Sequence, residues 1–227
     1  GFTVPLGERV GPEGEVHAFE PFRKVYQHLN ANVALNGLSN VFTHNVALGT
    51  EQKVIKLHQP DLTTWNFPSA IRVMDQFDTE RAVKEANLHY EEKLENVRME
   101  TLDSFEFPGR VALMKIDVEF MELEVVEGGR ARILQDRPIM WVENEPFFDD
   151  PPNKEFVNFM AEELSYECQS IARLELLCLP SEDPQDGIGQ LPAGFSRVFN
   201  HLKMQHQDNM LWGMLSEVDS DFAQRDV

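Results

Sequence analysis

Apolar positions in the first fifty residues recur with the spacings of alternating helices and strands. The start of a helix is indicated over residues 1–6, and the segment GPEG at residues 11–14 predicts a turn. Glu15–Phe19 alternates as a short strand does, and Pro21 opens a helix at the position that proline tolerates best. Asn40–Val46 predicts the next strand. This order of helix, strand, helix and strand is typical of a parallel sheet whose strands are joined by crossover helices.

The stretch LMKIDVEFMELEVVEGG at residues 113–129 is the one around which we expect the chain to be organised. Val111–Ile116 is short and apolar, as a buried parallel strand is, and Asp117 and Glu119 follow it directly. A short helix ended by two glycines is predicted next, and Pro138–Glu143 predicts a further buried strand that ends on an acid. Open α/β sheets bind ligands beyond the carboxyl ends of their strands, so these carboxylates are candidates for a binding site. A solvated turn between a strand and a helix would give the same pattern.

The segment between these two parts does not continue the alternation of helices and strands. Gln52–Leu57 predicts a strand, and Val97–Leu102 predicts another. Residues 58–96 are interpreted as an insertion that contains a marginal helix over Asp78–Leu94. Further elements are predicted at Asp103–Phe105 (a turn or short helix), Pro151–Leu164 (a helix), Ile171–Leu179 (one or two strands), Met210–Met214 (a strand) and Ser216–Val227 (a frayed tail). We therefore expect a single domain over residues 1–227.

Composition narrows the classes of function. With 227 residues, 42% of them hydrophobic, the chain is long enough for one sizeable α/β domain. A net charge of -19 argues against binding to nucleic acid or to an anionic membrane, because both need a basic surface. No apolar run in the sequence is long enough to span a bilayer. Cys168 and Cys178 make neither a disulfide framework nor a zinc motif, which favours a reduced, cytoplasmic setting. The first residue is Gly1 rather than Met, so we expect an incomplete amino terminus.

Seven phrases stand in an order and spacing that resemble one known family. They are GFTV (residues 1–4), GEVHAFEP (14–21), LNANVALNGLSNV (29–41), NVALG (45–49), METLDSF (99–105), KIDVE (115–119) and RPIMWVE (137–143). Together they resemble the FkbM-type methyltransferases over roughly residues 1–143. The resemblance implies a class I, Rossmann-like α/β fold with a mostly parallel central sheet and helices on both faces. It also implies S-adenosylmethionine (SAM) as the methyl donor, and a hydroxyl on a small molecule, sugar or lipid-like compound as the acceptor.

The resemblance implies roles for individual residues in holding the cofactor. Glu20 would accept hydrogen bonds from the ribose hydroxyls of SAM, although a carboxylate here would equally serve to cap the following helix. Asn45, Val46 and Ala47 would lie at the adenine edge, where an ordinary strand end is the competing interpretation. Gly1 would end the loop that holds the methionine part of SAM. No residue is assigned to a metal.

Three carboxylates are candidates for the catalytic role, namely Asp117, Glu119 and Glu143. Methyl transfer is an in-line displacement at a carbon bonded to a positively charged sulfur, so the protein has to align the acceptor oxygen and relieve it of a proton. Carboxylates suit a cationic donor, and one of them would act as the base, although the sequence does not say which. Asp117 is also expected to contact SAM. Glu122 is better explained as an acid that complements the helix dipole.

Two departures from the family pattern bear on function. The glycine that the family carries between the two acids is Phe120 here, and a phenylalanine would reshape or close part of the pocket. The strand and acidic-glycine loop that precede the equivalent of Gly1 in the family are missing, which predicts a chain of low stability that does not bind SAM measurably. The aromatic side chains Trp65 and Phe67 would line an acceptor pocket or pack beneath the insertion.

Two other functions compete with methyl transfer. A catalytically inert binding module or a gene fragment on the same fold would explain both departures. An NAD-dependent oxidoreductase would also suit Glu20, but the KIDVE phrase and the lack of an evident Tyr-x-x-x-Lys pair argue against it. Fold class alone does not choose among these functions, and the oligomeric state is not predicted by the sequence.

Overall fold

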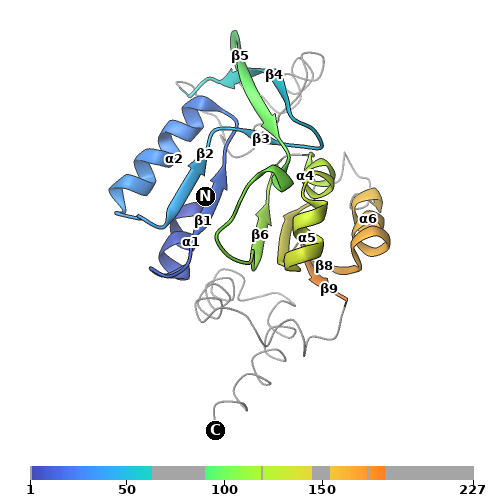
Figure 1. Ribbon diagram of the computed structural model, residues 1–227. Coiled ribbons are helices and arrows are strands. Elements are labelled where there is room, and N and C mark those ends of the chain that lie inside the picture. The colour runs from blue at the N-terminus through green and yellow to red at the C-terminus, as the bar shows by residue number, and fades with distance from the viewer. Residues whose placement is uncertain (1, 63–89, 119, 145–153, 173, 182–227) are drawn as a thin grey trace.

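A computed structural model of the chain describes residues 2–62, 90–118, 120–144, 154–172 and 174–181. Helices and strands alternate through much of this part of the chain (Figure 1). The elements are α1 (Thr3–Val10), β1 (Val16–Phe19), α2 (Arg23–Leu35), β2 (Val41–His44), β3 (Ala47–Leu48), β4 (Lys53–Pro60), β5 (Tyr90–Glu100), η2 (Leu102–Ser104), β6 (Leu113–Ile116), α4 (Glu122–Gly128), α5 (Arg130–Asp136), β7 (Ile139–Glu143), α6 (Lys154–Leu164), β8 (Tyr166–Ala172) and β9 (Glu175–Pro180).

The strands form three hydrogen-bonded groups, ordered β1-β2, β3-β5-β4 and β6-β7-β9-β8. Strands β1 and β2, β3 and β5, and β6 and β7 are parallel, whereas β4 and β5, β7 and β9, and β8 and β9 are antiparallel. The α/β class expected from the sequence is therefore confirmed, but the described sheets are mixed rather than mostly parallel. Strands β8 and β9 have to be antiparallel because the connection between them is too short for a crossover.

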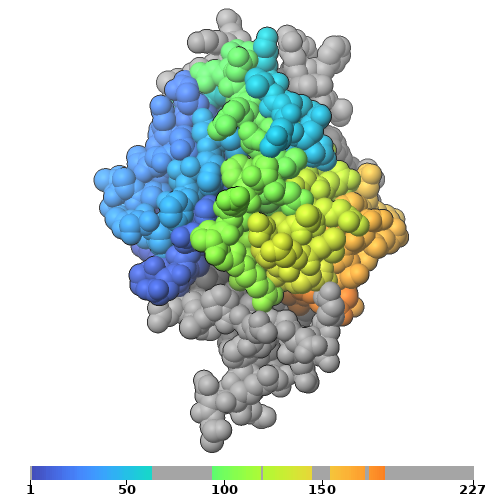
Figure 2. Space-filling model, in the orientation of Figure 1, coloured from blue at the N-terminus to red at the C-terminus, as the bar shows by residue number. Residues whose placement is uncertain are grey.

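The first and last parts of the described chain lie on either side of the segment that leads into β6. Figure 2 shows the amino-terminal part in blue and the part from α4 onward in yellow to orange, with green residues between them. Aromatic contacts connect the two parts, because the Phe2 ring meets the Trp141 ring edge-on at 4.9 Å between centroids. Phe19 of β1 meets Phe105, in the segment before β6, at the same centroid distance of 4.9 Å.

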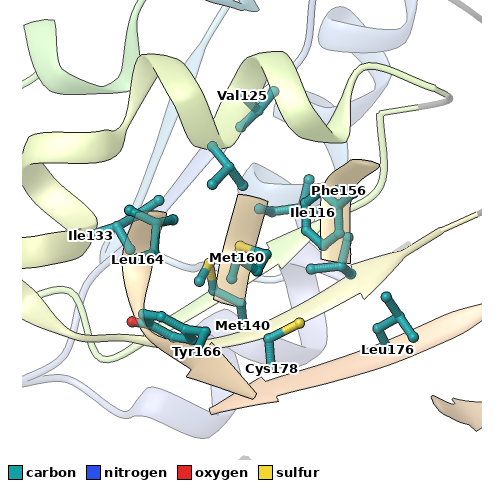
Figure 3. Packing of buried hydrophobic residues seen from close by; sticks show 12 residues of the cluster. Ile116, Val125, Ile133, Met140, Phe156, Met160, Leu164, Tyr166, Leu176 and Cys178 are labelled. Carbon is teal, nitrogen blue, oxygen red and sulfur yellow. The ribbon is translucent and has the colours of Figure 1, made fainter. Parts of the chain in front are cut away.

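The largest hydrophobic core lies between the β6–β9 sheet and helices α4, α5 and α6. Figure 3 shows side chains of these elements converging, namely Ile116, Val125, Ile133, Met140, Phe156, Met160, Leu164, Tyr166, Leu176 and Cys178. A smaller cluster around Ile139, Trp141 and Leu177 occupies the opposite face of the same sheet, where Phe2 also packs. Strand β7 is therefore buried on both faces, as the apolar segment Pro138–Glu143 predicts.

The predicted elements before residue 58 and those around residues 103–143 are confirmed within a few residues. The helix predicted over Asp78–Leu94 is wrong at its end, because residues 90–94 belong to β5, which pairs with β4. Helix α5 lies where the sequence analysis predicts no element. The loop with Trp65 and Phe67, residues 78–89, the strand at 210–214 and the tail at 216–227 lie outside the described residues.

The structure joins Cys168 and Cys178 in a disulfide, so the prediction of reduced cysteines is wrong. These residues stand directly opposite each other in the antiparallel pair of β8 and β9, with 4.0 Å between their Cα atoms. Directly opposed positions bring the two Cβ atoms close enough for a disulfide bond. The separation of ten residues in the sequence does not predict this disulfide, because the pairing of the two cysteines depends on the register of β8 and β9.

Candidate functional site

The parallel strands β1 and β2 end side by side at Glu20 and Asn45. The Glu20 N–H donates to the His44 carbonyl at 3.0 Å, which continues the ladder between the strands. The Asn45 Nδ2 donates to the carbonyl oxygens of Glu20 (2.8 Å) and Pro21 (3.2 Å). The structure therefore brings the two predicted cofactor residues together, and the Asn45 amide group stabilises the turn between β1 and α2.

One oxygen of the Glu20 carboxylate is bound at the start of α2. Its Oε1 accepts a hydrogen bond from the Phe22 N–H at 2.8 Å, immediately before the first residue of α2, so the capping interpretation is correct for this oxygen. Burial raises the pKa of Glu20 to about 7, and the hydrogen bond from Phe22 acts in the opposite direction. A carboxylate accepts several hydrogen bonds, so a ligand hydroxyl has an acceptor in the second oxygen.

Val46 and Ala47, the other residues predicted at the adenine edge, have buried side chains that are 2% and 3% exposed. Ala47 begins β3 and packs with Phe22 and Met99 in a core cluster. The structure thus leaves these two residues with only backbone groups to offer a ligand. Gly1 lies outside the described residues.

Asp117 and Glu143 lie at the carboxyl ends of the parallel strands β6 and β7. Ile116 pairs with Val142, so Asp117 and Glu143 both come one residue after this pair, at the same edge of the sheet. The Asp117 side chain is 26% exposed, so it is open to solvent. Glu119, the third carboxylate predicted for catalysis, lies outside the described residues.

The loop after Asp117 has an unusual backbone at Phe120, with φ of +76°. A positive φ of this size belongs to the left-handed region that favours glycine, the residue that the resembling family carries here. The Phe120 N–H donates to Glu122 Oε1 at 3.0 Å. Glu122 is 5% exposed, and burial raises the pKa of its carboxyl group. The Glu122 carboxylate therefore stabilises the loop through this hydrogen bond. It also lies in the first turn of α4, where the sequence predicts that it complements the helix dipole.

Two polar residues near this edge were missed by the sequence analysis. Lys115, in the middle of β6, has a side chain that is only 7% exposed. Asn144, directly after β7, is 3% exposed, and its Nδ2 has no hydrogen-bond partner among the residues that the structure describes. The one available signal was the lysine inside the apolar segment LMKI, because a charge at an inward position of a buried strand is rare.

His17 and His44 lie next to each other on β1 and β2, with His17 Nδ1 and His44 Nε2 3.1 Å apart. Their rings stack with each other and with those of Phe42 and Phe19, so both histidines have a structural role on these strands. In the described part of the chain, no group of three or more His, Cys, Asp and Glu residues is arranged to hold a metal ion. No helix among the described residues has the length and apolar character needed to cross a membrane.

Comparison with known proteins agrees with the resemblance seen in the sequence. The family model described as the Methyltransferase FkbM domain matches residues 1–168. The crystal structure of Methyltransferase FkbM from Methylobacillus flagellatus KT is similar, with a TM-score of 0.49 and 14% sequence identity. The match covers 76% of this chain and 41% of that chain, so the present chain spans less than half of the length of that protein. No curated protein sequence matches the chain.

Proposed function

Because the chain belongs to the FkbM methyltransferase family, we propose that it transfers a methyl group from SAM to a hydroxyl oxygen of a small-molecule acceptor. The observation that supports this proposal best is the position of three carboxylates at the ends of parallel strands. Glu20 follows β1, Asp117 follows β6 and Glu143 ends β7. The carboxyl ends of parallel strands are the usual ligand-binding edge in α/β folds, and we propose a Rossmann-like arrangement for this chain.

The residues present fit SAM in their chemistry. Glu20 offers an acceptor oxygen for ribose hydroxyl groups, and the backbone of residues 45–47 would lie at the adenine. The sulfonium of SAM is positively charged, and Asp117 provides a negative charge on the same sheet edge as Glu143. Gly1 would contact the methionine part of the cofactor.

The chemical task of this chain is to orient the acceptor and to take its proton. SAM, when bound, supplies a methyl group that is already activated by the positive sulfur. The chain's own part would be to hold the acceptor oxygen in line with that methyl group and to accept the hydroxyl proton on a carboxylate. Asp117, Glu119 and Glu143 are the candidates for this base. Alignment of the acceptor oxygen supplies the remainder of the rate enhancement.

Calorimetric titration of the chain with SAM tests the proposal directly. The missing first strand predicts no measurable binding by this chain, whereas the proposed function requires binding, so the titration decides between the two. If the function is as proposed, we expect binding, and we expect Glu20→Ala to weaken it by about 1.5–3 kcal/mol, the scale of hydrogen bonds to a charged group. Because the pKa of Glu20 is about 7 and the ribose hydroxyls need an ionised acceptor, the affinity should rise between pH 6 and pH 8. Glu13→Ala, at an exposed position, is the matched control.

The two possible failures have different meanings. A chain that does not bind SAM contradicts the proposed function. Binding that is unchanged in Glu20→Ala leaves Glu20 as a helix cap only. Mass spectrometry of pooled hydroxyl compounds with labelled SAM then detects transfer, and binding without transfer would support the inert binding module instead.

A further inference from the structure

Lys115 is a charged residue in a place that an apolar residue would fill more easily. It lies in the middle of β6, opposite Trp141 of β7, and its side chain is 7% exposed. The ammonium nitrogen lies 4.7 Å from the centroid of the Trp141 ring and 5.0 Å from that of the Phe2 ring. Among the described residues this nitrogen has no hydrogen-bond partner. Removing an ammonium group from water is costly, so packing alone does not explain a lysine here.

Carboxylates surround this ammonium group on the elements packed around it. Asp117, directly after the end of β6, is nearest, with its Oδ2 4.0 Å from Lys115 Nζ. Glu143 of β7, Glu175 of β9 and Glu122 of α4 also attract the charge. Burial is the largest influence and lowers the pKa of Lys115, while the four carboxylates raise it. The two aromatic rings also favour a cation at this place.

Two of these carboxylates belong to neighbouring strands of the sheet. Glu143 stands directly opposite Glu175 in the antiparallel pair of β7 and β9. The Trp141 Nε1–H donates to Glu175 Oε2 at 2.9 Å, which fixes this side chain beside the ring that covers Lys115. Like charges directly opposite each other on a sheet repel, and a cation between them offsets the repulsion. The charge of Lys115 is attracted by both Glu143 and Glu175 and therefore offsets part of this repulsion.

We propose that Lys115 is a positioning residue, whose ammonium group holds Asp117 and Glu143 in place at the carboxyl edge of β6 and β7. This inference rests on the proposed function, in which these carboxylates face the methyl group and the acceptor. Lys115 acts through them, because its Nζ is shielded from solvent. The residue therefore affects mainly the alignment of the base, and it affects the affinity for the cofactor only through Asp117.

The first test compares Lys115→Met, which removes the charge, with Lys115→Arg, which keeps it. Lys56→Met, at an exposed position of β4, is the matched control. In transfer from labelled SAM to the pooled hydroxyl compounds, we expect Lys115→Met to lower kcat by about 10–100-fold and Lys115→Arg to restore most of it. The Kd for SAM should change much less than kcat, since of the residues assigned to SAM only Asp117 is displaced and Glu20 and residues 45–47 are not. Unchanged kcat in Lys115→Met, or equal losses in kcat and SAM affinity, would overturn the inference.

The second test does not depend on methyl transfer. In the natural background, Asp117→Asn removes a partner of Lys115 and should lower Tm. In the Lys115→Met background the same change relieves repulsion among carboxylates and should raise Tm, by about 2–4 °C for a chain of this size. Equal effects of Asp117→Asn in both backgrounds would overturn the inference, even if SAM binding were found. A natural chain that does not bind SAM would instead contradict the proposed function, and the Tm comparison would still decide whether Lys115 works through Asp117.

Discussion

Glu20 and Lys115 are two ionisable side chains that the fold removes from water, each with a different consequence. Burial raises the pKa of the Glu20 carboxyl group to about 7 and lowers the pKa of the Lys115 ammonium group. Glu20 accepts a hydrogen bond from the Phe22 N–H, and Lys115 lies 4.0 Å from Asp117 and over the rings of Phe2 and Trp141. Perturbed groups of this kind concentrate at functional sites, and Glu20 and Lys115 both belong to the proposed site.

The raised pKa of Glu20 predicts how Glu20→Gln changes stability with pH. In the unfolded chain the carboxyl group ionises near pH 4.5, whereas in the folded chain it stays protonated until about pH 7. The stability that the protonated group contributes is therefore lost as the pH rises from about 4.5 through 7. Glutamine keeps an acceptor for the Phe22 N–H and does not ionise. The free energy of unfolding of Glu20→Gln, relative to the natural chain, should rise by about 1–3 kcal/mol between pH 5 and pH 8.

Urea unfolding at several pH values measures this difference. Glu13→Gln, an exposed substitution of the same type, should show a nearly constant difference over the same range. A constant difference for Glu20→Gln as well would mean that the carboxyl group is hydrated in the folded chain.

Single residues also show how far the site was predictable from sequence. Glu20, Asp117 and Glu143 were found because each follows or ends an apolar strand, and strand ends are visible as a local pattern. Lys115 and Asn144 were missed because their burial depends on partners distant in sequence, such as Phe2 against Lys115. The positive φ of Phe120 was equally hidden, because phenylalanine gives no sign of a left-handed backbone.

Among the elements, the pair β1–β2 carries a stack of aromatic rings on one face. Phe42, His17, His44 and Phe19 follow one another with centroid distances of 5.1, 5.4 and 4.7 Å. Phe105 and Phe107 meet the stack edge-on. Because burial and the neighbouring His17 lower the pKa of His44, the neutral ring is the form that the folded stack prefers.

His44→Phe should make this pair of strands less sensitive to acid. A folded pKa below 6.5 means that the stability from neutral His44 is present above pH 6.5 and is lost as the pH falls below it. Phenylalanine keeps the stacking and carries no charge. Because the His44 ring is only partly buried, we expect an effect below about 0.5 kcal/mol, or about 1–2 °C in Tm. Thermal melts of both proteins at pH 7.5 and pH 5.5 measure it, and His28→Phe on the exposed side of α2 is the control. An acid-induced loss of the same size in His44→Phe would contradict the prediction.

Elements with a strong local pattern were predicted well, and those set by distant contacts were not. Strand β5 has exposed Asn96 and Arg98 alternating with buried Val97 and Met99, yet its charged first half resembles a helix until its pairing with β4 is known. Helix α5 begins directly after two glycines, which in the sequence indicate the end of a helix and not the start of one. Its first N–H groups, those of Ala131 and Arg132, donate to the carboxylate of Asp103 in η2 at 2.9 and 2.8 Å, a cap from a distant segment.

At the scale of the whole molecule, the disulfide bears on the predicted setting of the protein. A cytoplasmic setting was inferred because two cysteines make no framework, but the structure joins Cys168 to Cys178 across β8 and β9. Disulfides persist mainly in oxidising compartments, so the cysteines no longer support a cytoplasmic setting. The mixed character of the sheets also emerged only at this scale, because strand direction follows from the path of the whole chain.

The charge of the chain predicts that salt stabilises it. The sequence holds 39 acidic and 20 basic side chains, for a net charge of -19. A large net charge destabilises a compact state through self-repulsion, and salt screens this repulsion. Raising NaCl from about 0.01 to 0.15 M shortens the screening length from about 30 to 8 Å. We expect Tm to rise by several degrees over this range.

The experiment needs a control that separates screening from the binding of particular ions. Potassium chloride and tetramethylammonium chloride at equal ionic strength should raise Tm by the same amount as NaCl, because screening depends on ionic strength. Replacing the exposed acids Glu13, Glu127 and Glu162 by Gln removes three negative charges. This variant should melt at a higher temperature in low salt and should respond less to added salt, since less repulsion remains to be screened. A Tm that falls as salt is added would show the opposite balance, in which attractive pairs such as Arg23 with Glu95 outweigh the repulsion among the acidic side chains.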